Sequence, residues 1–474
     1  MVEVEGVAGF GPIDRDEHGV FDDLAPDDRI ALDVDGHGSS RIQDANPFGL
    51  THVSCSWQDR IVPWTPPPRG AWVDKLAVTG QSLGDDGRSI ISLSPEELLG
   101  AAEATTGLSD WGDDWFRAPL GVLTESLESE ARLHLPGRLR ARSELQRILQ
   151  GRLQLVDLWG RQPEVLDTDV EAPVFVTGLG RSGTTLLHEL LALDPGARSP
   201  ALWEFAHPVP PPEAATAETD PRITIADDEI TVMDEMVPAF TGMHENRGFL
   251  PTECIFAFAY QCSTDMYTGL YDVPSYTMYR AGGDRTPEYA WHRRLLATLG
   301  SRRPGSWVLK APSHLSALPT LFAEYPDARV VITHRDPLRV VGSLTDMMAT
   351  LRWMHSDHVD HAAISELLGM GLVFQMDTVS AARDSGAVPE DRIHDVLYSD
   401  LIADPVATVE SLYADWDREF TSAFRARLQE YVDARHRGHT SGHDYSFADT
   451  GLDQHALREQ LRSYQERYGV VSEV

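Results

Sequence analysis

The segment Val174–Leu187, VFVTGLGRSGTTLL, constrains the fold of this chain more than any other. Its first four residues are apolar or β-branched and predict a buried strand, and the apolar stretch Thr184–Leu193 predicts a helix. The residues between them, Gly178 to Gly183, must form a tight turn. A strand, a glycine loop and a helix in this order direct backbone N–H groups and the positive end of the helix dipole to one point. The segment therefore predicts a phosphate-binding loop.

Predicted strands and helices alternate from this segment onward. Strands are expected at Val174–Thr177, Trp307–Lys310, Arg329–Thr333 and Ile393–Tyr398. Helices are expected at Thr184–Leu193, His314–Tyr325, Pro337–Thr350 and Pro405–Trp416. This order is typical of a parallel sheet flanked by crossover helices. We therefore predict a P-loop-like α/β domain over residues 171–474, with a long insertion at about 200–300.

The region before this domain carries weaker signals. Residues 1–90 are acidic and rich in Gly, Pro and Asp, and they predict an irregular N-terminal extension. Residues 91–170 predict a helical lead-in. Within it, Ser94-Pro95-Glu96-Glu97 is typical of a helix start, and two amphipathic stretches follow, Pro119–Leu133 and Leu139–Val156.

The charge balance limits the partners of the chain. Its formal net charge of −34 argues against a nucleic-acid or anionic-membrane partner, because a polyanion would be repelled. A phosphate-bearing ligand would then need locally placed cations. Among the 40 basic residues only Lys75 and Lys310 are lysines. Lys310 ends a predicted strand, which suggests that a compact ammonium group is needed there.

Targeting and metal-binding signals are weak. The N-terminus lacks the basic start and apolar core of a signal peptide, and no run of about 18 apolar residues predicts a transmembrane segment. The three cysteines form no C-x-x-C pair. His355, His358 and His361 have a spacing that can bind zinc, but an exposed polar helix face also explains them. We expect a cytoplasmic protein without a metal site.

The glycine loop departs from the nucleoside-triphosphate pattern G-x-x-x-x-G-K-[ST], because Thr184 occupies the lysine position. GLGRSGTTLL instead resembles the 5′-phosphosulfate loop of sulfotransferases that use 3′-phosphoadenosine 5′-phosphosulfate (PAPS). The similarity is strongest to the bacterial branch and the tyrosylprotein sulfotransferases. It implies that the 5′-phosphate contacts Gly180, Arg181, Ser182, Gly183, Thr184 and Thr185. An ordinary strand-to-helix turn is the alternative for the loop taken alone.

Two further motifs extend the resemblance to the 3′-phosphate. Arg335 ends a predicted strand, and Ser343 follows eight residues later. In the family, an arginine and a serine at this spacing bind the 3′-phosphate, and the planar guanidinium suits phosphate oxygens. The C-terminal segment at about 430–455 resembles the basic loop that closes over the co-substrate. That resemblance implies contacts from Arg437 and Gly438.

The resemblance also implies catalytic roles. Lys310 corresponds to a strand-end lysine that reaches the sulfuryl group and the bridging oxygen. Glu204 lies near the position of a glutamate base in the tyrosylprotein branch. If Glu204 only positions the backbone, His207, Glu253 or His314 would be the base. His314 could also cap a helix or line the acceptor pocket.

The motifs together predict in-line sulfuryl transfer from PAPS to a hydroxyl acceptor. The aromatic-rich stretch Phe249–Tyr279 is expected to cover the acceptor, which suggests a lipid, a glycan or another small molecule. The same aromatic residues could instead form the core of a lid. Two rivals remain: a nucleotide-dependent kinase and a non-catalytic module that binds a bisphosphate nucleotide. The sequence does not predict an oligomeric state.

Overall fold

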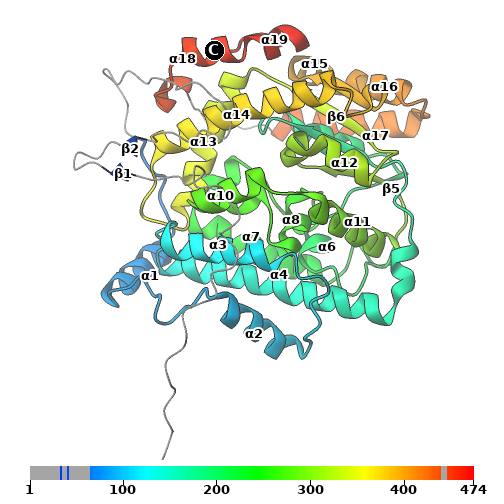
Figure 1. The fold of residues 1–474 in the computed structure, drawn as a ribbon. Coiled ribbons are helices and arrows are strands. Elements are labelled where there is room, and N and C mark those ends of the chain that lie inside the picture. The colour runs from blue at the N-terminus through cyan, green and yellow to red at the C-terminus, as the bar shows by residue number, and fades with distance from the viewer. Residues whose placement is uncertain (1–32, 35–39, 42–63, 439–445) are drawn as a thin grey trace, which may run out of the picture. The chain divides into compact units, whose positions relative to one another are not determined.

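The protein was analysed as a computed structural model that describes residues 33–34, 40–41, 64–438 and 446–474. The chain divides into two compact units, residues 1–54 and 55–474. The described part of the first unit is a pair of antiparallel strands, β1 (Asp33–Val34) and β2 (Ser40–Arg41). The second unit holds the helices and strands discussed below (Figure 1).

The second unit is built on a five-stranded parallel sheet with the strand order β4-β5-β3-β6-β7. The strands are β3 (Val174–Gly178), β4 (Ala197–Arg198), β5 (Ser306–Lys310), β6 (Arg329–His334) and β7 (Ile393–Leu397). The predicted α/β fold class is confirmed. The edge strand β4 was not predicted, because two residues are too few to give a periodic signal.

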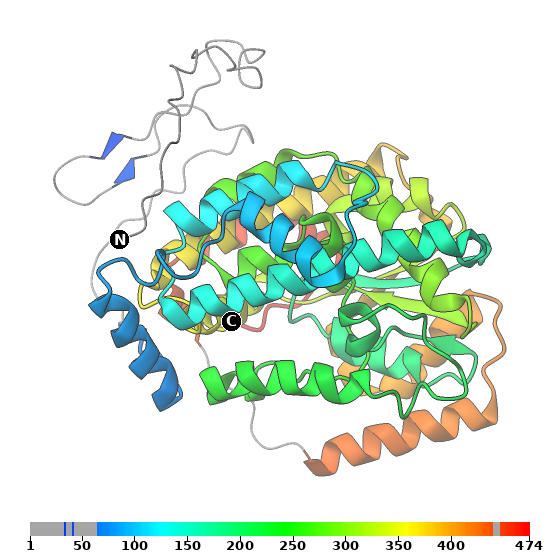
Figure 2. The ribbon, with the colours of Figure 1, turned by 90° about the horizontal axis from the view of Figure 1, so that it is seen from below.

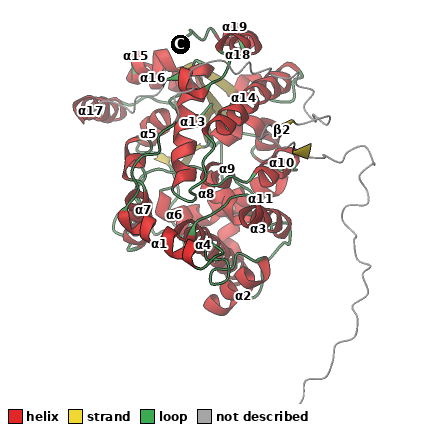
Figure 3. Ribbon diagram, turned by 90° about the vertical axis from the view of Figure 1, so that its left-hand side faces the viewer, coloured by secondary structure: helices red, strands yellow, loops and turns green. Residues whose placement is uncertain are grey.

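Helices pack on both faces of this sheet (Figure 3), and its central strand β3 is buried along its whole length. Val174 and Val176 belong to a core cluster with four helices that lie on one face: α5 (Thr184–Ala192), α15 (Tyr398–Ala403), α16 (Pro405–Asp415) and α17 (Ser422–Gly438). Phe175 points to the other face, where it packs against Tyr325 and His292. That face is covered by η4 (Pro312–Ala317), α11 (Thr286–Gly300) and α12 (Leu318–Glu324).

The region before the sheet contains the helices α2 (Pro95–Thr106), α3 (Arg117–Ser129) and α4 (Leu135–Arg161). Ser94 caps α2 by accepting the N–H of Glu97 at 3.3 Å, and α2 packs against α4 (Figure 2). A further helix, α1 (Ala71–Ser82), lies within the range where an irregular extension was expected. Burial of Val73 against Met236 and Met354 stabilises it there.

The insertion between β4 and β5 is helical. Its helices before α11 are α6 (Leu202–Ala206), α7 (Arg222–Met236), α8 (Ile255–Phe258), α9 (Asp265–Leu270) and α10 (Pro274–Gly282). The aromatic residues that were expected to cover an acceptor are largely core residues. Tyr267, Tyr271 and Tyr276 are buried in one cluster with the leucines of α3 and α4. The alternative of a packed lid core therefore describes these three tyrosines.

Helix α13 (Pro337–Trp353) follows β6, and α14 (His361–Asp384) packs against it. Within the described ranges, α14 is the one helix that is long and apolar enough to cross a membrane, judged by length and composition alone. Apolar residues on one side of α14 are buried in the domain, among them Ile364, Leu372 and Met376. Packing inside the domain therefore accounts for the apolar residues of α14. Two short helices, α18 (Gln454–Gln460) and α19 (Arg462–Tyr468), follow later in the chain.

Candidate active site

The glycine loop between β3 and α5 depends on backbone conformations that favour glycine. Gly178 has φ +143°, and a Cβ atom there would lie 2.5 Å from the carbonyl oxygen of Thr333. Gly183 has φ +91° and directly precedes α5. The loop can therefore turn tightly against β6 and present the first N–H groups of α5 at the carboxyl edge of the sheet.

Ser182 holds the shape of this loop from within. Its Oγ donates to the carbonyl oxygen of Leu179 at 2.5 Å, and it lies 2.6 Å from the hydroxyl of Thr333. The side chain is fully buried. The backbone N–H of Ser182 also donates to the Leu179 carbonyl oxygen, at 3.2 Å, so in this arrangement both its hydroxyl and its N–H serve the loop itself.

Arg181, Arg335 and Ser343 come together beside the loop, although 162 residues separate Arg181 from Ser343. The Nε of Arg181 donates to the Oγ of Ser343 at 3.1 Å, and Arg335 Nη1 donates to the carbonyl oxygen of Arg181 at 2.9 Å. The Arg335 guanidinium also lies 4.0 Å from the ring centre of Tyr398. Two arginines and a hydroxyl therefore surround one position at the strand ends, a set of donors suited to an anion.

The second cluster is formed by Lys310, Thr185 and Glu253. The Lys310 ammonium donates to Thr185 Oγ1 at 3.3 Å and forms a short ion pair with the Glu253 carboxylate. The Lys310 side chain is 3% exposed and that of Glu253 15%, so little water screens the pair. Because Thr185 belongs to the first turn of α5, the cluster lies at the start of the phosphate-binding helix.

Backbone pairing fixes the position of Glu253. The N–H of Cys254 donates to the Lys310 carbonyl oxygen at 2.8 Å, and the N–H of Thr252 donates to the Pro200 carbonyl oxygen at 2.9 Å. Burial raises the pKa of Glu253, but the Lys310 ammonium and His244 oppose this, and the pKa falls below its ordinary value of 4.5. Glu253 is therefore a carboxylate at neutral pH.

Glu204, the predicted base, has other partners. One carboxylate oxygen accepts from Arg198 at 2.9 Å and Arg303 at 3.1 Å, and the other accepts the N–H of Ala201 at 2.9 Å. The side chain is fully buried. These contacts hold the start of α6 in place and match the backbone-positioning alternative for Glu204. His207, another candidate, pairs with Glu229 at 3.4 Å.

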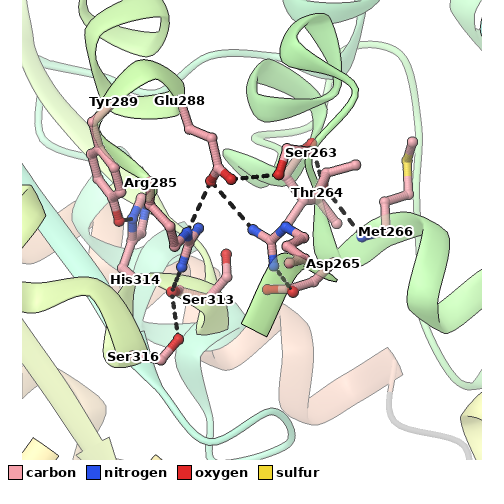
Figure 4. A network of polar contacts seen from close by, with 12 residues as sticks. Ser263, Thr264, Asp265, Met266, Arg285, Glu288, Tyr289, Ser313, His314 and Ser316 are labelled. Carbon is pink, nitrogen blue, oxygen red and sulfur yellow. Dashed lines mark hydrogen bonds and ion pairs between the residues drawn. The ribbon is translucent and has the colours of Figure 1, made fainter. Parts of the chain in front are cut away.

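His314, the third predicted catalytic residue, is a core residue. Its Nδ1 lies 2.8 Å from the hydroxyl of Tyr289 (Figure 4). Its ring packs edge-on against Phe175. It is fully buried, and burial holds its pKa well below 6.5, so the imidazole stays neutral. The surroundings of His314 do not suit an acceptor-facing proton shuttle.

Figure 4 also shows how the turn after Lys310 is supported. Arg285 donates to the carbonyl oxygen of Ser313 at 3.0 Å and to Glu288 at 2.9 Å, and Ser263 donates to Glu288 at 2.6 Å. The Glu288 side chain is 1% exposed. This buried network joins the start of α11 to η4, which follows β5 and Lys310 in the chain.

The predicted co-substrate contacts Arg437 and Gly438 end helix α17, which packs on the sheet through Phe424 and Leu428. The side chain of Arg437 and residues 439–445 lie outside the described part, so the expected closing loop is not described. Among the residues that the structure describes, no group of three His, Cys, Asp or Glu side chains is arranged to hold a metal ion.

Two residues next to this site, His244 and Glu473, could not be identified from the sequence. His244 lies close enough to Glu253 and Lys310 to interact with their charges, and burial lowers its pKa to about 4. Glu473 binds Arg335 through both carboxylate oxygens, each at 2.8 Å. His244 belongs to no recognisable motif, and Glu473 lies 138 residues from Arg335, so no local pattern predicts either contact.

Comparisons with known proteins agree with this geometry. Residues 173–422 match the sulfotransferase family. Sulfotransferase STF9 from Mycobacterium avium is 26% identical, with a TM-score of 0.73 over 80% of this chain and 98% of its own. Sulfotransferase STF1 from Mycobacterium tuberculosis H37Rv is 32% identical, with a TM-score of 0.67 over 78% of this chain and 98% of its own. In sequence, 286 residues are 24% identical to the omega-hydroxy-beta-dihydromenaquinone-9 sulfotransferase Stf3 of Mycobacterium bovis, covering 55% of this chain and 67% of Stf3.

Proposed function

The chain belongs to the sulfotransferase family, and we propose that it transfers the sulfuryl group of PAPS to a hydroxyl group of a small-molecule, lipid or glycan acceptor. The observation that carries this proposal is the cluster of Lys310, Thr185 and Glu253 at the start of α5. It combines a cation, a helix start and an ionised carboxylate at one point.

The donors of the site suit a nucleotide with two separate anionic groups. The glycine loop and the start of α5 offer N–H groups to the 5′-phosphosulfate, and Thr185 adds a hydroxyl. Arg335 and Ser343 lie on either side of Arg181 and would hold the 3′-phosphate. That Arg335 already binds a carboxylate supports an anion at this position. PAPS, when bound, supplies a transferable sulfuryl group and a stable bisphosphate leaving group.

The residues around Lys310 would stabilise charge and move one proton. As the acceptor oxygen bonds to sulfur, the bond from sulfur to the bridging oxygen of the 5′-phosphate breaks. Lys310 would place its ammonium against that bridging oxygen, which keeps the electron pair and gains negative charge. Glu253 would accept the proton of the acceptor hydroxyl. The protein thus contributes mainly positioning and electrostatics.

Glu253 replaces Glu204 as the proposed base because of their partners. Glu204 is fixed by two arginines and a backbone N–H, whereas Glu253 pairs with the one lysine of the site. The ion pair would open when Lys310 turns to the leaving group, and the freed carboxylate becomes more basic. Because its pKa lies below 4.5 while the pair is intact, Glu253 would enter the reaction as a carboxylate between pH 6 and 8.

A relative suggests which class of acceptor to test first, and this class contains more than one compound. Stf3 is named for sulfuryl transfer to the hydroxyl of a menaquinone derivative, an apolar isoprenoid lipid. We therefore place hydroxylated isoprenoid lipids first in a panel that also holds sterols, phenols and glycans. The buried tyrosines of α9 and α10 give this order no support, since they pack in the core.

The direct test is to incubate the protein with PAPS and each acceptor, and to measure 3′,5′-adenosine bisphosphate by chromatography and the sulfated product by mass spectrometry. We expect product formation with at least one hydroxyl acceptor and none with ATP and magnesium as donor. Phosphorylated product from ATP would favour the kinase instead. Tight bisphosphate binding without any sulfated product across the panel would favour the non-catalytic module.

A further inference from the structure

A two-point ion pair lies at the position proposed for the 3′-phosphate. Arg335 Nε and Nη2 each donate to a different carboxylate oxygen of Glu473 at 2.8 Å, although 138 residues separate them. The side chain of Arg335 is 13% exposed and that of Glu473 29%. This two-point pairing of a guanidinium and a carboxylate uses the same donors that a phosphate would use.

The segment that carries Glu473 is held by polar contacts. The N–H groups of Glu473 and Val474 donate to Asp336 Oδ2 at 2.5 and 3.3 Å, and Arg458 donates to the Val474 carbonyl oxygen at 2.8 Å. Residues 471–474 are exposed and belong to no helix or strand. A segment with few buried apolar contacts can leave its position at low cost in free energy.

From this contact we propose that Glu473 competes with the 3′-phosphate for Arg335, so that residues 470–474 set the affinity for 3′-phosphorylated nucleotides. The inference rests on the proposed function. A phosphate carries more negative charge than a carboxylate and has further oxygens for the Ser343 hydroxyl. Replacement of the Glu473 carboxylate by the 3′-phosphate at Arg335 is therefore favourable. The ligand must nevertheless displace Glu473, and this weakens its binding in proportion to the fraction of molecules in which Glu473 occupies Arg335.

The position of the contact between Glu473 and Arg335 determines which nucleotides it affects. Competition acts on ligands that carry a 3′-phosphate and leaves adenosine 5′-monophosphate unaffected, because the monophosphate has no 3′-phosphate that would have to displace Glu473 from Arg335. Release of the bisphosphate product also becomes easier, because Glu473 can take over Arg335 as the 3′-phosphate leaves. Product release limits turnover in many enzymes.

Calorimetric titration of the full chain tests this proposal. Dissociation constants for 3′,5′-adenosine bisphosphate and for adenosine 5′-monophosphate are measured on wild type, Glu473→Gln and Glu473→Ala. The matched control is Glu459→Gln, an exposed glutamate that pairs with Arg462 in the same region. We expect both Glu473 variants to bind the bisphosphate about tenfold more tightly, with unchanged binding of the monophosphate and an unchanged control.

A second readout follows the segment itself. Amide hydrogen exchange of residues 470–474 should become faster when wild type is saturated with the bisphosphate and stay unchanged with the monophosphate. Equal bisphosphate affinity in wild type and both Glu473 variants, with no change in exchange, would overturn the competition while leaving the proposed function intact. Failure of the bisphosphate to bind any variant, Glu473→Gln included, would contradict the proposed function and this inference with it.

Discussion

Lys310 and Glu253 carry the proposed chemistry, and their removal should affect turnover more than binding. Lys310→Met removes the ammonium from the leaving oxygen and should lower kcat by about 100-fold or more. Glu253→Gln removes the proton acceptor and should lower kcat by about 100-fold. Initial rates of bisphosphate release with the best acceptor of the panel measure both effects. Lys75→Met is the matched control, because Lys75 is exposed on α1 and is the other lysine of the chain. Changes below threefold in the site variants would contradict their roles.

Glu204 should matter for stability. Glu204→Gln leaves Arg198, whose side chain is 3% exposed, without its charged partner. Loss of one member of a buried ion pair costs about 3 kcal/mol of unfolding free energy, which chemical denaturation would measure. The matched control is Glu213→Gln, because Glu213 pairs with Arg302 on the surface and should contribute less than about 0.5 kcal/mol. Equal effects of the two substitutions would show that Glu204 has no special structural role.

The glycine loop should be sensitive to substitution. Gly178→Ala would force a Cβ atom to within 2.5 Å of the Thr333 carbonyl oxygen at φ +143°. We expect a loss of about 2 kcal/mol or more in unfolding free energy and at least tenfold weaker bisphosphate binding. Gly100→Ala is the control, because this position in α2 has open space and should gain up to about 1 kcal/mol. A Gly178→Ala protein that binds as wild type does would contradict the loop geometry.

The elements that could be predicted from sequence are those with strong local patterns. The capped helix α2, the glycine loop and the four longer strands each have a signal within a few residues, and the structure contains all of them. The arginine partners of Glu204 could not be predicted, because they come from β4 and from the residues just before β5. Glu473 was missed because its contact with Arg335 spans 138 residues. Long-range pairs of single polar residues leave no periodic trace in a sequence.

For the molecule as a whole, buried neutral histidines predict a loss of stability in mild acid. Burial lowers the pKa values of His188, His292 and His355 to about 3, whereas an unfolded histidine has a pKa of about 6.5. The unfolded chain therefore takes up protons that the folded chain cannot, and stability falls as pH drops below 6.5. Between pH 7 and 5 the loss is about 2 kcal/mol per histidine.

Chemical denaturation at several pH values measures this dependence. His355→Asn should lower the free energy of unfolding at pH 7. It should also reduce the part of the loss between pH 7 and 5 that these three histidines cause by about a third. Carboxylates change little in this window, because most are ionised in both states. A flat profile in wild type would contradict the burial of neutral imidazoles.

The measurement that tests the proposed chemistry most directly is binding of 3′,5′-adenosine bisphosphate, compared with ATP and magnesium, on wild type and Arg335→Ala. The account predicts selective binding of the bisphosphate to wild type and a loss of about 2 kcal/mol or more in the variant, since Arg335 would hold the 3′-phosphate. Preference for ATP, or equal bisphosphate binding with and without Arg335, would contradict it.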